Sequence, residues 1–280
     1  MSQVKKFEYV IEDHRLDDID FKFASWKHPA SGEITFDQGI FDFTKSYLNP
    51  GDIVIDVGTH VGIETMMYAL AVGKEGKVYG FEPNPYVFES FEKTCELNKD
   101  IVNIIPIMKA ITEENGTYTF HYSDAAYCNG GFASETDAGV GACGHSHPIE
   151  VEGVNFLDWL RENAPNDITK IKLFKTDTEG YDLQILKSVR LFLSIVRPII
   201  QSELFYSLSD DEIQNQLQFL DDLDYANFYF PEEWQSAIGS IDIYSVPIAY
   251  EMFTAEHWTY VKRMCKGKNL ISIPKEKVKT

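Results

Sequence analysis

Short apolar runs alternate with amphipathic stretches along most of the chain, and this pattern predicts a parallel β-sheet covered by helices. Residues 53–57 form a short, apolar and β-branched run that suits a buried strand, and a second strand is expected at 77–81. Asn84-Pro85 then predicts the cap and first residue of a helix. Between the two runs, apolar residues recur at the spacing of one helical face: Ile63, Met66, Met67, Leu70 and Ala71.

The alternation continues downstream. Further strands are expected at 101–105, 117–122, 148–154, at the start of 171–182, and at 197–203. Helices are expected at 156–160, across the pattern of Leu183, Leu186 and Val189, and after the capping box that begins at Ser209. The runs 225–230 and 241–246 are expected to supply a last, antiparallel pair, and the charged tail 275–280 to fray.

The chain reads as a single domain, 1–280, with two additions. Residues 1–34 are rich in aromatic and acidic side chains and are expected to form a β-rich extension, a hairpin beside the sheet. Residues 124–147 are rich in glycine and small residues, and loops of this length inside a domain are often lids. We expect an insertion that caps the substrate, with an ordinary surface loop as the alternative.

The turn after the first strand carries the candidate chemistry. Gly58 allows a sharp turn and a close approach of ligand to backbone, and Gly62 can open the following helix. Glu82 ends the second strand, where doubly wound folds place ligands, and one carboxylate can accept from both hydroxyls of a ribose. Asp56 could favour an ammonium group directly or through water. This layout suits S-adenosylmethionine.

A nicotinamide cofactor fits the same turn less well. The dinucleotide signature G-x-G-x-x-G is absent, because position 60 is His and position 63 is Ile. The alternative is a purely structural role, in which both glycines serve a tight turn and Glu82 is a solvated strand end. A second polar block, with Asp177 and Glu179 after the apolar run that starts at 171, argues against that alternative.

Four segments together resemble a known family. Residues 51–58, 81–85, 155–158 and 175–181 are similar, in this order, to the FkbM family of S-adenosylmethionine-dependent methyltransferases. The resemblance covers roughly residues 35–230, and Lys-x-Asp-x-Glu-Gly, which begins at Lys175, is its most specific part. The family usually has Gly-Ala-Asn where this chain has Gly58-Thr59-His60.

The resemblance implies a Rossmann-like class I methyltransferase fold, which is α/β with a seven-stranded, mostly parallel sheet, an antiparallel last strand and helices on both faces. It also implies a helix over the cofactor, so that Asp37 or Gln38 lines the pocket, with a surface role as the alternative. The residues expected to bind the donor are Asp56, Gly58, Thr59, His60, Gly62, Glu82, Pro83, Asn84, Lys109 and Ala110.

Asp177, Glu179 and Lys175 are the candidate catalytic residues, and Glu203 could extend the acidic side of the acceptor site. Residues at that strand end lie beside the sulfonium in this architecture, and a carboxylate can take a proton from the acceptor. An ordinary carboxylate is a weak base for an alcohol, so either its neighbours raise its pKa or a divalent cation such as Mg²⁺ acidifies the hydroxyl. The alternative is that Asp177 and Lys175 form a purely structural ion pair. No residue is assigned here as a metal ligand.

The expected function is therefore O-methylation of a small-molecule or sugar hydroxyl. N-methylation of a small metabolite and a non-catalytic binding protein on the same fold are the alternatives, because fold alone does not fix function. A nicotinamide-dependent oxidoreductase ranks well below both. The sequence does not name the acceptor, and association into a homodimer stays open.

Composition narrows the partners and the compartment. With 25 Lys and Arg against 44 Asp and Glu, the net charge of −19 disfavours nucleic acid as a substrate. No stretch approaches the roughly 18 to 20 apolar residues of a membrane-spanning helix. Four irregularly spaced cysteines fit a reducing cytoplasm better than a disulfide framework. Cys128, Cys143, His145 and His147 lack the spacing of a zinc site.

Overall fold

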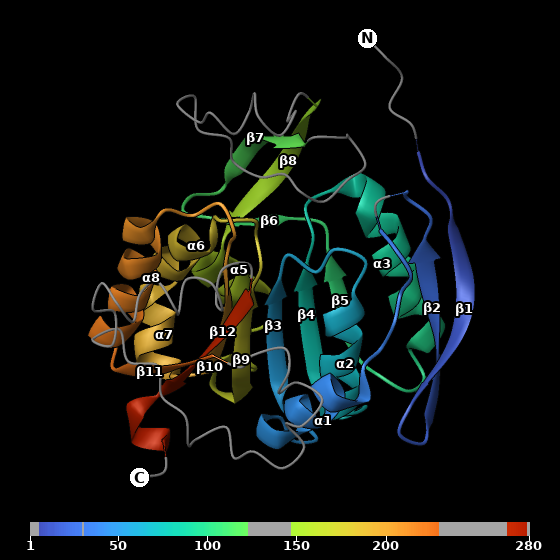
Figure 1. The fold of residues 1–280 in the computed structure, drawn as a ribbon, viewed down its shortest axis with the longest axis horizontal. Helices are drawn as coiled ribbons and strands as arrows, with labels where there is room; N and C mark the ends of the chain where they lie inside the picture. Colours follow the sequence, from blue (N-terminus) through green and yellow to red (C-terminus); the bar gives the residue numbers. More distant parts are fainter. Residues whose placement is uncertain (1–5, 30, 123–146, 230–267, 279–280) are drawn as a thin grey trace.

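The computed structural model of the chain describes residues 6–29, 31–122, 147–229 and 268–278 (Figure 1). Seven strands form one sheet in the order β11-β12-β10-β9-β3-β4-β5. Within this sheet β12 runs antiparallel to both of its neighbours, whereas β10, β9, β3, β4 and β5 pair in parallel. The strands are β3 (Ile53–Val57), β4 (Lys77–Phe81), β5 (Ile104–Ile107), β9 (Ile171–Thr176), β10 (Ile199–Leu204), β11 (Tyr225–Tyr229) and β12 (Lys268–Pro274). The predicted class I methyltransferase fold is confirmed.

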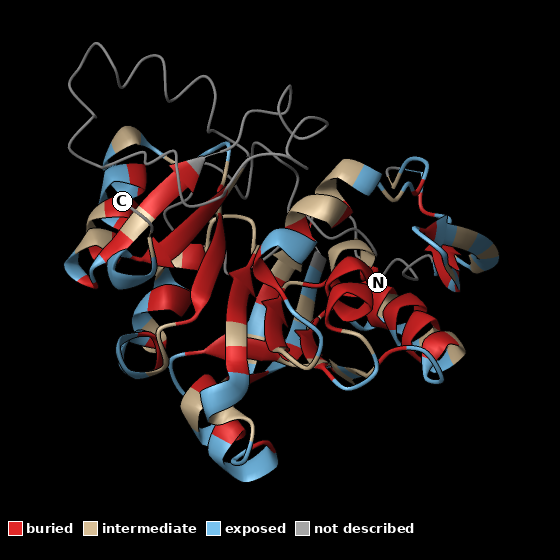
Figure 2. Cartoon of the chain, turned by 90° about the horizontal axis from the view of Figure 1, so that it is seen from below, coloured by how far each residue is buried: buried red, intermediate tan, exposed pale blue. Residues whose placement is uncertain are grey.

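Helices cover both faces of this sheet, so its central strands are buried from both sides (Figure 2). In β3 the side chains of Ile53, Ile55 and Val57 join one apolar core and Val54 joins the other, as alternation along a strand requires. The first core contains side chains of α5 (Phe156–Asn163), α6 (Asp182–Ser188), α7 (Arg190–Val196) and α8 (Asp210–Asp222). The second contains side chains of α1 (Gln38–Tyr47), α2 (Ile63–Val72) and α3 (Pro85–Asn98).

The N-terminal residues form a hairpin of β1 (Tyr9–Leu16) and β2 (Ile19–Trp26) that packs along α3 (Figure 1). Two hydrogen bonds tie β2 to that helix. The backbone N–H of Ala24 donates to Thr94 Oγ1 at 3.0 Å, and Ser90 Oγ donates to the carbonyl of Ala24 at 2.5 Å. The hairpin is thereby attached to the element that follows Glu82.

A separate three-stranded sheet lies at the end toward which β3, β4 and β5 point (Figure 1). It consists of β6 (Ala110–Thr112), β8 (His147–Asn155) and β7 (Gly116–Tyr122), in that order. The expected cap at 124–147 lies outside the described residues, except for its last residue, which begins β8.

One strand prediction needs correction, and one strand was not predicted. The third core strand is β5, 104–107, and not 101–105, because the backbone N–H groups of Ile101 and Val102 donate to the carbonyl of Asn98 and so close the last turn of α3. Within the described residues β11 pairs in antiparallel with the unpredicted β12, and the segment 241–246 lies outside the described residues. β12 has the same alternating apolar pattern, and its Leu270 and Ile271 enter the two opposite cores.

The tail also differs from the expectation of fraying, up to residue 278. A 3-10 turn, Lys275–Lys277, follows β12, and Lys275 Nζ lies 2.6 Å from Asp221 Oδ1 of α8. Among the helices that the structure describes, none is long and apolar enough to span a membrane.

Candidate active site

Three strand ends meet at one cavity of about 210 Å³. Val57 of β3 is in register with Phe81 of β4 and with Thr176 of β9, so the next residue of each strand lies at the same edge of the sheet. Of the residues expected to bind the donor, six line the cavity: Gly58, His60, Glu82, Pro83, Lys109 and Ala110. Of the catalytic candidates, Asp177 and Glu179 line it.

Both glycines of the β3–α2 turn sit where a larger residue would not fit. Gly58 has φ of +82°, and a Cβ there would lie 1.9 Å from the carbonyl oxygen of Asp177. Its backbone N–H donates to the carbonyl of Phe81 at 2.9 Å, so the turn is held between the ends of β4 and β9. Gly62 has φ of +90°, and a Cβ there would meet the ring of Phe91 at 2.5 Å. The turn therefore presents bare backbone to the cavity at Gly58.

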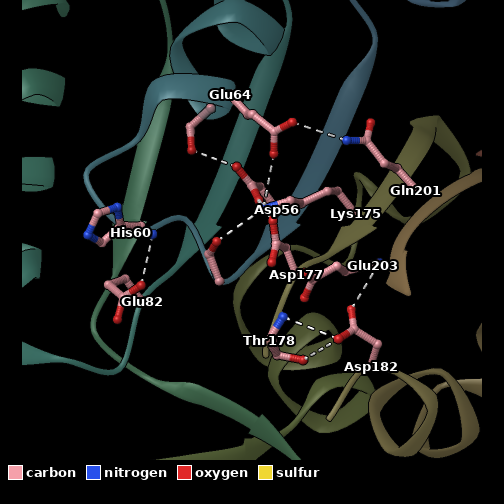
Figure 3. Close-up of polar contacts among 12 residues, drawn as sticks. Asp56, His60, Glu64, Glu82, Lys175, Asp177, Thr178, Asp182, Gln201 and Glu203 are labelled. Carbon is pink, nitrogen blue, oxygen red and sulfur yellow. Dashed lines mark hydrogen bonds and ion pairs between the residues drawn. The ribbon is translucent and has the colours of Figure 1, made fainter. Parts of the chain in front are cut away.

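Glu82 is buried, with 6% exposure, and is held by backbone amides (Figure 3). Its Oε2 accepts from the N–H of His60 at 2.8 Å, and its Oε1 accepts from the N–H of Asn84 at 2.8 Å. Burial raises the pKa of Glu82 to about 7, although both hydrogen bonds oppose the rise. Each carboxylate oxygen has a second lone pair, so Glu82 can still accept from two ligand hydroxyls.

The side chain of His60 lies beside Glu82, on the side away from Lys175 and Asp177 (Figure 3). Its ring packs edge to face against Trp26 of the hairpin, with centroids 5.7 Å apart. Burial lowers the pKa of His60 to about 4, and the charge of Lys175 adds to this effect. The residue has φ of +51°, a region that Asn, the usual residue of the resembling family, also tolerates. His60 is therefore neutral at pH 7 and joins the hairpin to the turn.

Lys175 lies behind the cavity, 2% exposed, among three carboxylates (Figure 3). Its Nζ is 3.2 Å from Asp56 Oδ1, 3.3 Å from Glu64 Oε2 and 3.7 Å from Asp177 Oδ2, and it donates to the carbonyl of Gly58 at 3.1 Å. Burial opposes its charge, yet the carboxylates outweigh burial and hold the pKa of Lys175 well above its ordinary value. This ammonium therefore links the donor turn to the end of β9.

Several predicted donor residues lie near the cavity without lining it. Asp56 is fully buried, where it contacts Lys175 and accepts from Thr65 Oγ1 at 2.6 Å, so it belongs to the network behind the wall. Asn84 caps α3 by accepting from the N–H of Tyr86 at 3.0 Å. Thr59 is buried, and Gly62 forms the N-cap of α2.

Asp37 and Gln38 take the surface role. The side chain of Asp37 caps α1, and that of Gln38 donates to Asp17 and Asp42. Neither lines the cavity.

The sequence did not single out Glu64 or Asp182 as site residues, and it indicated Glu203 only as an extension of the acidic side of the acceptor site. Asp182 is fully buried and accepts from Thr178 at 3.3 Å through the N–H and 3.2 Å through Oγ1, and from the N–H of Glu203 at 3.4 Å. Burial, reinforced by Asp177, raises the pKa of Asp182 to about 6 and that of Glu179 to about 7. The pKa of Glu203 rises for the same reasons.

No signal in the sequence reveals these contacts, because Glu64 reads as an ordinary first-turn acid of a helix and Glu203 as a strand end. In the described part of the chain, no group of three or more His, Cys, Asp or Glu side chains is arranged to hold a metal ion.

Comparison with known proteins gives a consistent family. The model of the methyltransferase FkbM domain matches residues 56–228, more than half of the chain. A hexuronic acid methyltransferase of Haloferax volcanii, AglP, is 25% identical over 154 residues, which are 53% of this chain and 54% of that protein. Methyltransferase sdnD of Sordaria araneosa is 22% identical over 173 residues, 55% of this chain and 66% of that protein. The chain thus spans between half and two thirds of the length of these relatives.

A crystal structure of a methyltransferase FkbM from Methylobacillus flagellatus is 15% identical, with a TM-score of 0.38, and the match covers 63% of this chain and 36% of that one.

Proposed function

This chain belongs to the methyltransferase FkbM domain family, and we propose that it transfers the methyl group of S-adenosylmethionine to a hydroxyl oxygen of a sugar or another small molecule. One observation carries the proposal. A buried carboxylate oriented by two backbone amides, a turn with no Cβ and a second carboxylate share one cavity at the ends of three neighbouring strands.

The donor half of the cavity fits adenosylmethionine. Glu82 is positioned to accept from the two ribose hydroxyls, and the bare backbone at Gly58 gives room for the methionine portion. Lys109 and Ala110 line the cavity beyond Glu82, where we place the adenine. β3 lies between β4 and β9, so a donor that extends from Glu82 across Gly58 directs its sulfur toward Asp177.

Asp177 is the proposed base. When bound, the donor supplies a methyl group on a positive sulfur, and the acceptor oxygen displaces that sulfur in line. Asp177 holds the acceptor hydroxyl and takes its proton as the oxygen is methylated. Its side chain is 32% exposed, whereas that of Asp56 is fully buried, and Lys175 Nζ is farther from Asp177 (3.7 Å) than from Asp56 (3.2 Å). Asp177 is therefore the member of this network that remains available to a ligand.

The acceptor class is supported by one relative. AglP is named as a hexuronic acid methyltransferase, and a sugar hydroxyl is the kind of oxygen that Asp177 could deprotonate. Transfer to nitrogen of a small metabolite and a non-catalytic binding role are the competing assignments.

The test is release of S-adenosylhomocysteine with panels of sugars, sugar nucleotides, glycans and small alcohols. With an acceptor found in this way, Asp177→Asn should lower turnover by at least about a hundredfold while donor binding is retained. Asp18→Asn changes the charge by the same amount on a fully exposed side chain of the hairpin turn, and it should leave turnover unchanged.

Transfer of a ¹³C-methyl group to the product distinguishes O-methylation from N-methylation, because O-methyl and N-methyl carbons differ in chemical shift. Donor binding without release on any panel would favour the binding protein. Near-normal turnover of Asp177→Asn would remove this residue from the chemistry.

A further inference from the structure

Three carboxyl groups beyond Lys175 have no cation to balance them among the residues that the structure describes. Glu179, Asp182 and Glu203 cluster at the ends of β9 and β10, and none of them forms an ion pair with another described residue. The charge of Lys175 acts on Glu179 and Glu203, but its ammonium is already shared by Asp56, Glu64 and Asp177. In addition, Glu203 Oε2 is buried and has no hydrogen-bond partner within the described ranges.

This negative charge acts on one end of the cavity. Asp177 and Glu179 line the cavity directly. Asp182 lies close enough to raise the pKa of Glu179, and Glu179 lies close enough to raise the pKa of Glu203. Among the described residues that line the cavity, Lys109 is the cationic one, and its Nζ forms a short ion pair with Glu152 of β8. His60 is neutral. The end of the cavity near Asp177 is therefore a place where a positive charge is stabilised and a neutral group is not.

We propose that these carboxylates make the site discriminate by charge between the donor and its product, binding S-adenosylmethionine more tightly than S-adenosylhomocysteine. The two molecules differ by the methyl group and the positive charge that it places on sulfur, and all other donor contacts are common to both. Loss of that charge in the transfer step lowers the affinity of the site for the product and favours product release. This inference rests on the proposed function, since it needs the donor sulfur to face Asp177.

A proton linkage follows from the same geometry. The groups that face Glu203 are Asp177, Asp182, Glu179 and, with opposite sign, Lys175. Burial and these like charges keep part of the cluster protonated near neutral pH. A bound cation lowers the pKa of each carboxyl, so binding releases protons and affinity rises with pH.

Product binding lacks this linkage. S-adenosylhomocysteine brings no charge on sulfur, so its affinity changes less over the same range. Titration of Glu82 affects both ligands equally, because both carry the ribose, and it cancels in the ratio of their dissociation constants.

Calorimetric titration tests the proposal with two probes that differ only at sulfur. We expect S-adenosylmethionine to bind at least about tenfold more tightly than S-adenosylhomocysteine near pH 8.5, and this ratio to shrink at least about threefold near pH 6. Sinefungin, which carries an amine at the position of the transferred methyl, should follow the charged donor. Titrations in two buffers of different ionisation enthalpy should show proton release for the two cations and little for the product.

Variants assign the effect to the cluster. Glu203→Gln should cut the ratio near pH 8.5 at least about threefold without changing product affinity, and Glu179→Gln is a second variant should the first not fold. Glu75→Gln removes the same charge from the exposed turn before β4, at the opposite end of the sheet, and should change neither affinity.

Equal affinities near pH 8.5, tighter binding of the product, or a ratio independent of pH would overturn the proposal. Absence of binding by both ligands would overturn the proposed function itself, so the two failures are distinguishable.

Discussion

The two halves of the cavity are built in opposite ways. At the ends of β3 and β4, the carboxylate of Glu82 is satisfied by two backbone N–H groups, and the nearby turn contributes backbone at Gly58. At the end of β9, side-chain charges crowd together: the ammonium of Lys175 is shared by Asp177, by Asp56 of β3 and by Glu64 of α2. Backbone fixes position, whereas side-chain charge sets the local field. The first half therefore suits a donor of constant shape, and the second suits chemistry in which charge moves.

The largest expected effect concerns the ammonium that joins the halves. Lys175→Met leaves Asp56, Glu64 and Asp177 without their shared cation, and breaking a buried ion pair in this way costs about 3–5 kcal/mol of unfolding free energy. Urea denaturation measures it. Lys22→Met removes an exposed pair with Asp13 and should cost much less unfolding free energy, because water screens an exposed pair. Similar losses in the two variants would show that the network around Lys175 does not connect the halves.

A substitution in the donor half of the cavity should change the affinity for S-adenosylmethionine. Glu82→Ala removes two charge-assisted hydrogen bonds to the ribose, each worth on the order of 1.5–3 kcal/mol, so the affinity for S-adenosylmethionine should fall at least about tenfold. Calorimetry measures the fall, with Glu75→Ala, in the exposed turn before β4, as the control. Unchanged affinity in the Glu82 variant would remove this residue from the site.

The charged half should respond to pH. Burial raises the pKa of Glu179 to about 7 and that of Asp182 to about 6, both above their unfolded values. Between the unfolded and the raised pKa the folded state binds more protons, so the stability of the ligand-free protein should fall as pH rises from about 5 to 7.5. Thermal melting should show a shallower fall for Glu179→Gln than for Glu114→Gln, an exposed carboxylate. Identical slopes of melting temperature against pH would mean that folding does not raise the pKa of Glu179.

The smallest expected effect tests whether the donor turn depends on backbone alone. His60→Asn keeps the N–H that Glu82 accepts and tolerates the positive φ, so donor affinity should change by less than about threefold. His60→Val, which is β-branched and strained at that φ, should weaken binding more. A large loss in the Asn variant would show that the contact with Trp26 also sets donor affinity.

Local pattern was enough to predict the core of the fold. β3 and β4 have the predicted bounds because each is a short apolar run closed by a turn, and the capping box at Ser209 opens α8 as expected. β12 was not predicted, because its apolar alternation alone does not reveal its long-range pairing with β10 and β11.

The candidate site was predictable where motif residues follow strand ends. Gly58, Glu82 and Asp177 reach one cavity because register puts consecutive strand ends at one level. The contact of Glu64 with Lys175 and the burial of Asp182 could not be predicted, since both depend on how α2 and α6 pack across the sheet.

The most direct test of the account is a crystal structure of the chain with S-adenosylhomocysteine. We expect both ribose hydroxyls within hydrogen-bonding distance of Glu82, the methionine portion against Gly58, and the sulfur on the side of Asp177. A product bound elsewhere, or in this cavity with its sulfur turned away from Asp177, would contradict the account.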